Sequence, residues 1–249
     1  MPLFGALDVA GALSGAPTMT SLTPDAWSLP GMELLQVSFE VAEEAALALT
    51  PPACHPSIPP YATFTVASFP TSPRGPFTLA MVRLIVRAGI RPRGLLLGSF
   101  TDNPAVAEEL EANWGYRIRT ADVSFSRRYE LIRGSVTING TPALDVGVRD
   151  PEPISGSDLE LFDNLHLTHL ADNDPVIVQV DPTYTHHRSD RGRPELATYD
   201  AALLGTIGLD PTYPVVGVAT TADMELTAPR FLMDPETPAI KGTRRLDTV

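Results

Sequence analysis

The sequence predicts a mainly β (α+β) protein, with antiparallel strands in a barrel or double sheet and a few short helices beside them. Short runs of alternating apolar and polar residues recur along the chain, and turn-forming pairs separate them. Few segments combine helical periodicity with matching end signals. Because 43% of the 249 residues are hydrophobic, the chain can bury a core and still enclose space for a ligand.

The body of the protein opens with a strand and then a helix. Alternation over residues 32–39 predicts the strand, and residues 41–49 predict a short helix that begins with acidic residues and stops at Pro51. Residues 1–30 have little periodicity and several turn formers. We expect them to form a loose arm over the body or an oligomer contact.

Three neighbouring antiparallel strands come next. Residues 61–69, 77–88 and 95–100 have strand character, although the alternation in the second run is less regular. Turn sequences at residues 72–75 and 91–94 separate them.

A second helix has well-defined end signals. Asn103 suits the N-cap position and Pro104 the first helical position, and apolar residues then recur at helical spacing until Gly115.

The remainder of the chain is rich in β-strand signals. The strongest local signal is Asn139-Gly140 between two alternating runs, which predicts a hairpin turn. The segment around His186-His187 has the composition of a loop. Strands are predicted over residues 119–125, 129–138, 143–148, 161–170, 176–180 and 215–226.

One continuous domain is expected, because no Gly/Ser linker or charge block divides the chain. Its predicted bounds are residues 31–235, between the N-terminal arm of residues 1–30 and a polar tail of residues 236–249.

The formal charge of −12 argues against nucleic acid and anionic membranes as partners, because both would repel the protein. A small-molecule partner fits better. The single cysteine, Cys54, excludes an internal disulfide, and the N-terminus lacks a basic region typical of a signal peptide. We therefore expect a cytoplasmic protein.

Residues 108–134 carry a resemblance to a known family. Trp114, Gly115 and Tyr116 match the central motif of the acetoacetate decarboxylase family, and Ala121 falls one residue beyond the family's alanine. The order of predicted elements also agrees over about residues 30–235. The resemblance implies the fold of that family and a homo-oligomer.

The sequence departs from the family pattern where the chemistry would be. The family uses one lysine to form a Schiff base with a ketone and a second to lower its pKa, and these positions hold Ile118 and Arg119. Arg117 replaces the preceding proline, and residues 77–81 lack the family's glutamate. The only lysine, Lys241, lies in the polar tail. Schiff-base decarboxylation is therefore not expected.

The motif still suggests a binding site. If it forms a strand with the family's orientation, Ile118 faces the cavity while Arg117 and Arg119 face out. The arginines then serve either as surface or salt-bridged residues or as binders of a carboxylate or enolate. We predict Tyr116 and Glu111 as catalytic residues, and as substrate-binding residues Trp114, Ile118, Asn113, Thr78, Met81, Arg117 and Arg119.

No metal or cofactor is expected. The pairs His166/His169 and His186/His187 lack a third ligand at recognisable spacing. A Gly-rich phosphate loop and a Gly-x-Ser-x-Gly motif are both missing from the sequence.

Two functional hypotheses remain. The first is an enzyme, of secondary metabolism, that binds a hydrophobic carbonyl-bearing compound such as a polyketide-like intermediate and promotes cyclisation, isomerisation or elimination by holding it in a reactive conformation. The second is a non-catalytic binding or assembly protein on the same fold.

Overall fold

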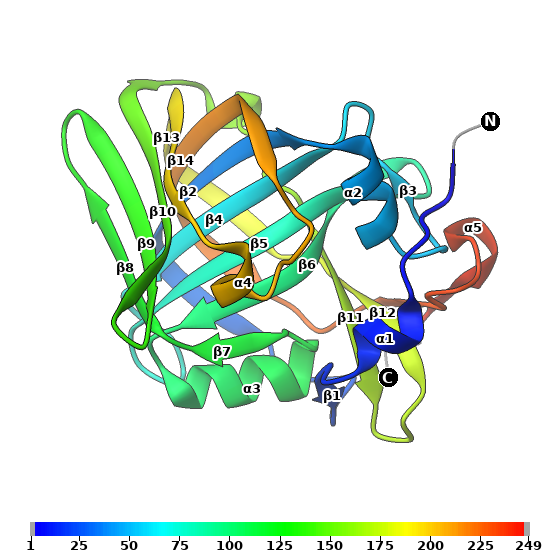
Figure 1. Ribbon diagram of the computed structural model, residues 1–249. Helices are drawn as coiled ribbons and strands as arrows, with labels where there is room; N and C mark the ends of the chain where they lie inside the picture. Colours follow the sequence, from blue (N-terminus) through cyan, green and yellow to red (C-terminus); the bar gives the residue numbers. More distant parts are fainter. Residues whose placement is uncertain (1–2, 247–249) are drawn as a thin grey trace.

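One mixed sheet of 16 strands organises the molecule (Figure 1), and the computed structural model describes residues 3–246. The strand order along the main path is β16-β15-β12-β11-β6-β5-β4-β2-β14-β13-β10-β9-β8. The strands are β1 (Thr18–Met19), β2 (Trp27–Val41), β3 (His55–Pro56), β4 (Tyr61–Phe69), β5 (Phe77–Ala88), β6 (Arg91–Thr101), β7 (Ile118–Thr120), β8 (Asp122–Arg127), β9 (Leu131–Ile138), β10 (Thr141–Pro153), β11 (Asn164–Leu170), β12 (Pro175–Val180), β13 (Thr183–Tyr199), β14 (Pro211–Leu226), β15 (Phe231–Met233) and β16 (Thr243–Arg245). The helices are α1 (Val9–Leu13), α2 (Glu43–Leu49), α3 (Pro104–Trp114), α4 (Ala201–Leu204) and α5 (Ala239–Gly242), with a 3₁₀ turn at Gly156–Asp158.

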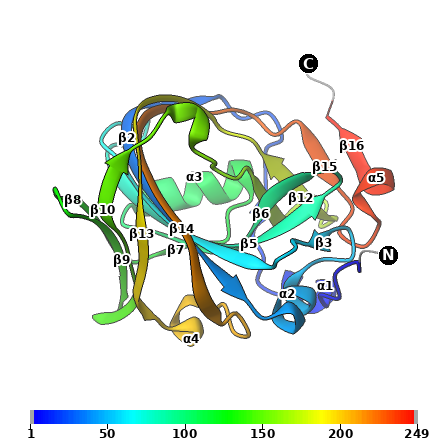
Figure 2. The same ribbon diagram turned by 90° about the horizontal axis from the view of Figure 1, so that it is seen from above.

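The sheet curls strongly, and α3 lies across one end of the curl (Figure 2). The mainly β class with short helices is confirmed. A closed barrel is not what forms, because β8 pairs only with β9 and β16 only with β15 within the described residues. The barrel prediction is therefore corrected to an open, curled sheet.

The strands and the helix with the strongest signals in the local sequence lie at the predicted positions. Strands β4 and β5 have the predicted bounds. Helix α3 begins where the Asn103 side chain accepts hydrogen bonds from the backbone N–H groups of Ala105 and Val106. It ends at Gly115, whose φ of 67° requires the left-handed conformation that glycine adopts without strain.

Two segments differ from the prediction. The loop-like segment around His186 is part of β13, whose side chains are mostly exposed or half-buried. This strand is held by backbone hydrogen bonds to β10 and β14. Because neither face of it is largely buried, its sequence lacks the apolar alternation that would predict a strand. The single strand predicted over residues 119–125 is divided at Ala121 into β7, parallel to β6, and β8, antiparallel to β9.

Both ends of the described chain contain ordered elements. Val9 and Leu13 on α1 are buried in the core, and β1 pairs with β11. At the other end α5 is followed by β16. Within residues 3–246, no helix has the length and apolar character needed to cross a membrane.

Hydrophobic clusters lie on both faces of the central strands. On β2, Leu35 and Val37 belong to a cluster that includes residues of β9 and β10, whereas Met32 and Leu34 belong to one that includes residues of α3. The second face, called the α3 face below, also carries buried polar side chains.

Close packing between β4 and β9 gives a first prediction. A Cβ added to Gly134 would lie 2.5 Å from the Cβ of Val66, so we expect Gly134→Ala to lower the free energy of unfolding by about 2 kcal/mol or more. Urea unfolding measures this. Gly156→Ala is the control, because its Cβ would meet its nearest neighbour at 3.4 Å, and equal effects of the two changes would contradict the prediction. Adding Val66→Ala to the Gly134→Ala variant should restore only part of the lost stability, since alanine keeps the Cβ that clashes.

Candidate functional site

Two cross-strand rows of side chains form a buried polar cluster on the α3 face. The register places Gln36, Thr65, Met81, Ser99 and Ile118 opposite one another along β2, β4, β5, β6 and β7. Residues directly opposite each other in a sheet point to the same face. All five are buried, so this row brings the motif residue Ile118 into line with polar residues far away in the sequence.

The next row contains Ser38, Thr63 and Arg83. The Arg83 side chain lies at the centre of the cluster, with only 3% of the residue exposed. Its Nη1 donates to Phe162 O at 2.9 Å and to Asn164 Oδ1 at 2.7 Å. Its Nη2 donates to Gln36 Oε1 and Thr65 Oγ1, both at 2.7 Å. Four of its donors thus bind uncharged acceptors.

Arg83 forms no ion pair within the described residues, although the more distant Asp163 carboxylate acts to raise its pKa. Among the described residues no carboxylate lies within 4.0 Å of its guanidinium, and its Nε has no hydrogen-bond partner. Burial lowers the pKa of Arg83 from its usual value, but an arginine stays protonated under any such shift. Burying an ion without a counter-ion costs several kcal/mol, which makes this position unusual for a purely structural residue.

Two hydroxyl groups beside Arg83 also lack partners. Ser38 Oγ and Thr63 Oγ1 are fully buried and make no hydrogen bond within the described residues. Since buried polar groups are nearly always paired, three unpaired groups in one row indicate a place for a ligand or water.

His166 borders the cluster from β11, two residues beyond Asn164 on the same face. Its Nδ1 lies 2.7 Å from Trp114 O and donates to that carbonyl, so Nε2 is left as a buried acceptor without a partner. Burial lowers the pKa of His166 to about 4, so the ring is neutral at pH 7. The Tyr116 ring meets it edge-on at 4.2 Å, and burial raises the pKa of the Tyr116 hydroxyl, which stays protonated.

A pH dependence follows from His166. Its folded-state pKa of about 4 lies below the usual 6.5, so the unfolded chain binds the proton first as the pH falls. The stability that the neutral ring contributes is present above pH 6.5 and is lost towards pH 4, by roughly 3 kcal/mol in all. We expect urea unfolding at pH 7 and pH 4.5 to show a smaller loss for His166→Gln than for the wild type. Equal losses would contradict the buried neutral ring.

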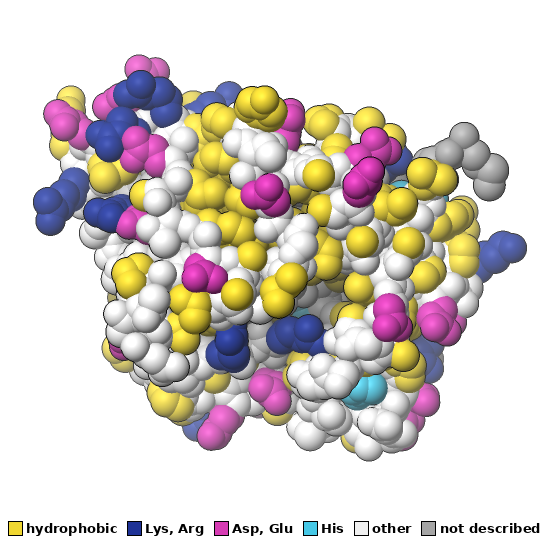
Figure 3. All heavy atoms as spheres, in the orientation of Figure 1, with side chains coloured by type: hydrophobic (Ala, Val, Ile, Leu, Met, Phe, Trp, Pro, Cys, Tyr) yellow, Lys and Arg dark blue, Asp and Glu magenta, His cyan; other side chains and the backbone are white. Residues whose placement is uncertain are grey.

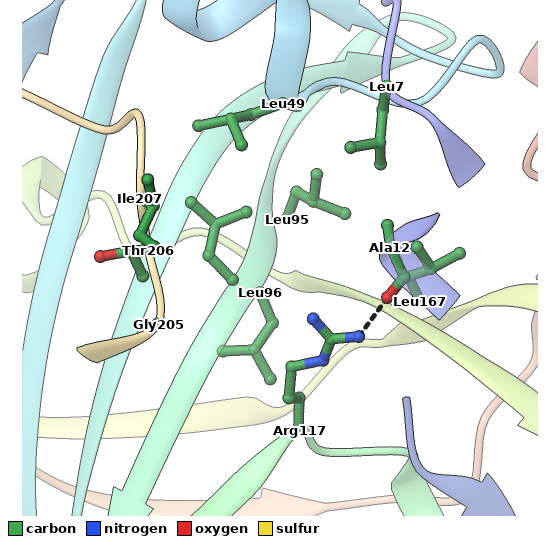
Figure 4. Close-up of a pocket in the computed structure, with 11 residues that line it drawn as sticks. Leu7, Ala12, Leu49, Leu95, Leu96, Arg117, Leu167, Gly205, Thr206 and Ile207 are labelled. Carbon is green, nitrogen blue, oxygen red and sulfur yellow. Dashed lines mark hydrogen bonds between the residues drawn. The ribbon is translucent and has the colours of Figure 1, made fainter. Parts of the chain in front are cut away.

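A separate hollow lies on the outer side of β6 and β7. A part of about 300 Å³ is lined by Arg117, Glu111 and Arg119, together with Ile118, Leu204 and Gly205. Figure 3 shows hydrophobic side chains over the middle of this surface and basic side chains beside a recess below them. An adjoining part of about 100 Å³ is mainly apolar and shares Arg117 with the first (Figure 4).

No family model matches the sequence, and no curated protein is significantly similar to it. Solved structures do match. The crystal structure of acetoacetate decarboxylase from Legionella pneumophila is similar with a TM-score of 0.72, over 86% of this chain and 90% of that chain, at 17% sequence identity. The chain has the acetoacetate decarboxylase-like fold.

Other proteins with the acetoacetate decarboxylase-like fold match as well. The enduracididine biosynthesis enzyme MppR, solved in complex with pyruvate, gives a TM-score of 0.72 over 86% of this chain and 93% of that chain, at 16% identity. An acetoacetate decarboxylase-like enzyme from Sphingomonas wittichii gives 0.63 over 84% and 93%, at 15% identity. At such identities the similarity establishes the fold, so functional residues must be argued from this chain's own geometry.

The structure gathers some of the predicted site residues and separates others. Tyr116, Ile118, Met81 and Trp114 lie together in the hydrophobic cluster of the α3 face. Trp114 is fully buried, and its Nε1 donates to Thr227 O at 2.8 Å.

The other predicted residues lie elsewhere. Thr78 is the second residue of β5, and the alternation of the strand places it on the opposite face from Met81. Asn113 is half-buried on α3. Arg119 lies over the ring of Phe100, at 4.8 Å, whereas Ile118 belongs to the cluster of the α3 face and also lines the hollow beside β7.

Sequence reasoning did not find the centre of the polar cluster, Arg83. One available signal was an arginine in the middle of β5, an otherwise apolar run in which the first ten residues are buried. Its partners Gln36, Thr65 and Asn164 come from three other strands, so only the register reveals them. Within residues 3–246, His, Cys, Asp and Glu side chains form no group of three that could hold a metal ion.

Proposed function

We propose that the polar cluster around Arg83 binds a hydrophobic carbonyl-bearing small molecule and promotes its isomerisation, cyclisation or elimination without a Schiff base. The observation that carries this proposal is the buried Arg83 cation, which within the described residues forms no ion pair and has an Nε without a hydrogen-bond partner. It stands in a row with two unpaired hydroxyls, beside the row that contains Ile118. At the position where the family has its reactive lysine, this chain has the hydrocarbon side chain of Ile118, and the fixed positive charge of Arg83 lies close by.

Such a cluster suits reactions in which a carbonyl oxygen gains negative charge. When a ketone enolises, the charge on oxygen increases, and fixed donors in a water-poor site stabilise it strongly. Arg83 Nε, Ser38 Oγ and Thr63 Oγ1 are the available donors. The proton leaves the α-carbon for His166 Nε2 and returns to a carbon of the same molecule, so no co-reactant is needed.

Apolar residues around the cluster favour a hydrophobic substrate. Ile118 and Met81 lie in the neighbouring row and supply contacts for a hydrocarbon chain. Tyr116 would act as a hydrogen-bond donor to the substrate, because burial raises its pKa and its hydroxyl stays protonated. Glu111 lines the outer hollow instead.

Residues 159–163 cover the cluster and must move for a ligand to enter. Gln36 Nε2 donates to Glu160 O at 3.2 Å, and Arg83 Nη1 donates to Phe162 O. The Phe162 ring packs against Tyr61 at 5.9 Å. A bound ligand oxygen would take the place of the Phe162 carbonyl at Arg83.

Proton exchange of a simple ketone tests the proposal. We expect the wild-type protein to accelerate exchange of the α-protons of 2-octanone in D₂O, followed by NMR. A Ser38→Ala/Thr63→Val double variant should slow this by about tenfold or more, because two donors are lost. The stability of this variant should be unchanged or higher, since these hydroxyls have no hydrogen-bond partner in the part of the chain that the structure describes.

Ser57→Ala is the matched control, because Ser57 Oγ is also buried and unpaired but lies outside the two rows. Its exchange rate should equal that of the wild type. Absence of both binding and exchange in the wild type would refute the proposal. Binding without exchange would favour the second candidate, a non-catalytic binding protein, which the same unpaired donors also support.

A further inference from the structure

The outer hollow combines two unpaired cations with an apolar recess. Arg117 donates to Ala12 O and Arg119 Nη2 donates to Leu203 O at 2.8 Å. Within residues 3–246 neither guanidinium has a carboxylate within 4.0 Å, although the chain carries a formal charge of −12. Each guanidinium has five N–H donors, so most of them remain available.

The walls of the smaller part of the hollow are mainly apolar. The smaller part is surrounded by Leu7, Leu49, Leu95, Leu167 and Ile207, with the Arg117 guanidinium at its edge (Figure 4). Arg117 also lines the larger part. These walls come from the N-terminal segment, α2, β6, β11 and the loop after α4. A ligand with a hydrocarbon end and an anionic end matches this arrangement.

We propose that the outer hollow is a second binding site, separate from the Arg83 cluster, for a medium-chain carboxylic acid. The hydrocarbon chain occupies the apolar part, and the carboxylate binds Arg117 and Arg119 in the larger part. The planar guanidinium matches a carboxylate in two-point geometry and is weakly hydrated, so it binds such a group well at a half-buried position.

Glu111 also lines the larger part, where it is the one acidic residue among the described lining residues. Two cations against one carboxylate still leave the hollow positive. Burial raises the pKa of Glu111 above its usual value.

Titration calorimetry with octanoate tests the site. We expect octanoate to bind the wild-type protein at least tenfold more tightly than 1-octanol, which lacks the charge, or acetate, which lacks the chain. Arg117→Leu should weaken octanoate binding by tenfold or more and remove the preference over 1-octanol. Arg128→Leu is the control, since Arg128 is an exposed arginine on the turn between β8 and β9.

Two further variants keep the test decisive. Ala12→Phe would fill the apolar part of the hollow. Octanoate binding should therefore weaken, while the unfolding temperature of the protein stays the same. This variant tests the site even if Arg117→Leu fails to fold. The Ser38→Ala/Thr63→Val variant should bind octanoate like the wild type. Equal binding of octanoate and 1-octanol, unchanged binding by Ala12→Phe, or loss of binding in the Ser38/Thr63 variant would each overturn the proposal.

Discussion

Ile118→Lys is expected to turn a protein that forms no covalent adduct with ketones into one that does. Ile118 is 9% exposed and lies on the same face as Arg83, one row away. An amine placed there loses hydration and faces a positive charge, and both effects lower its pKa and leave free amine at neutral pH. Borohydride treatment with 2-octanone should then label the variant almost completely, as measured by intact-protein mass.

A matched control separates this effect from the simple presence of a lysine. Ile90 is 96% exposed, so Ile90→Lys makes the same change in water and should label as poorly as the wild type. We expect Ile118→Lys to be less stable by about 3 kcal/mol, because it buries an amine in place of a hydrocarbon. Labelling no greater than that of Ile90→Lys would mean that position 118 does not face the polar cluster.

Arg83→Met is expected to lower the stability of the protein strongly. The change removes the donors that hold Phe162 O, Asn164, Gln36 and Thr65, and it leaves these buried acceptors to find new partners. Removing the uncompensated charge offsets part of this loss. We expect a net loss of about 3 kcal/mol in the free energy of unfolding, or a decrease of about 10 °C in Tm.

Urea and thermal unfolding measure the Arg83 effect, and Arg87→Met is its control on the same strand. Arg87 is half-buried, and its Nε makes no hydrogen bond in the described structure, so its removal should cost little. Arg83→Lys keeps the charge but not the planar fork and should fall between the wild type and Arg83→Met. An Arg83→Met variant as stable as the wild type would contradict this prediction. It would mean that the free energy lost in burying the cation equals the free energy gained from its four hydrogen bonds.

The fold was predictable where the signal is local. Helix α3 has its cap and stop in the sequence, and Asn139-Gly140 forms the hairpin turn with positive φ at both residues. Strand β13 was not predictable in this way, because it depends on backbone pairing with β10 and β14. Whether a curled sheet closes also depends on how its two end strands meet, which no local pattern encodes.

The site was predictable only around its motif. Tyr116 and Ile118 could be singled out because they are neighbours of a recognisable Trp-Gly-Tyr sequence. Arg83 could not, because its importance comes from partners on β2, β4 and β11 that meet only after folding. The location of Glu111 in the outer hollow could not be predicted either, because it depends on how α3 packs against β7.

The open sheet leaves two terminal strands that could recruit other chains into aggregates. β16 presents Thr243, Arg244 and Arg245, all exposed, and β8 begins and ends with charged residues, Asp122 and Arg127. Charged side chains on terminal strands discourage edge-to-edge growth, because an added strand would bring like charges together or bury them. The polar character of these short strands thus protects the protein against amyloid-like association, although the sheet does not close into a barrel.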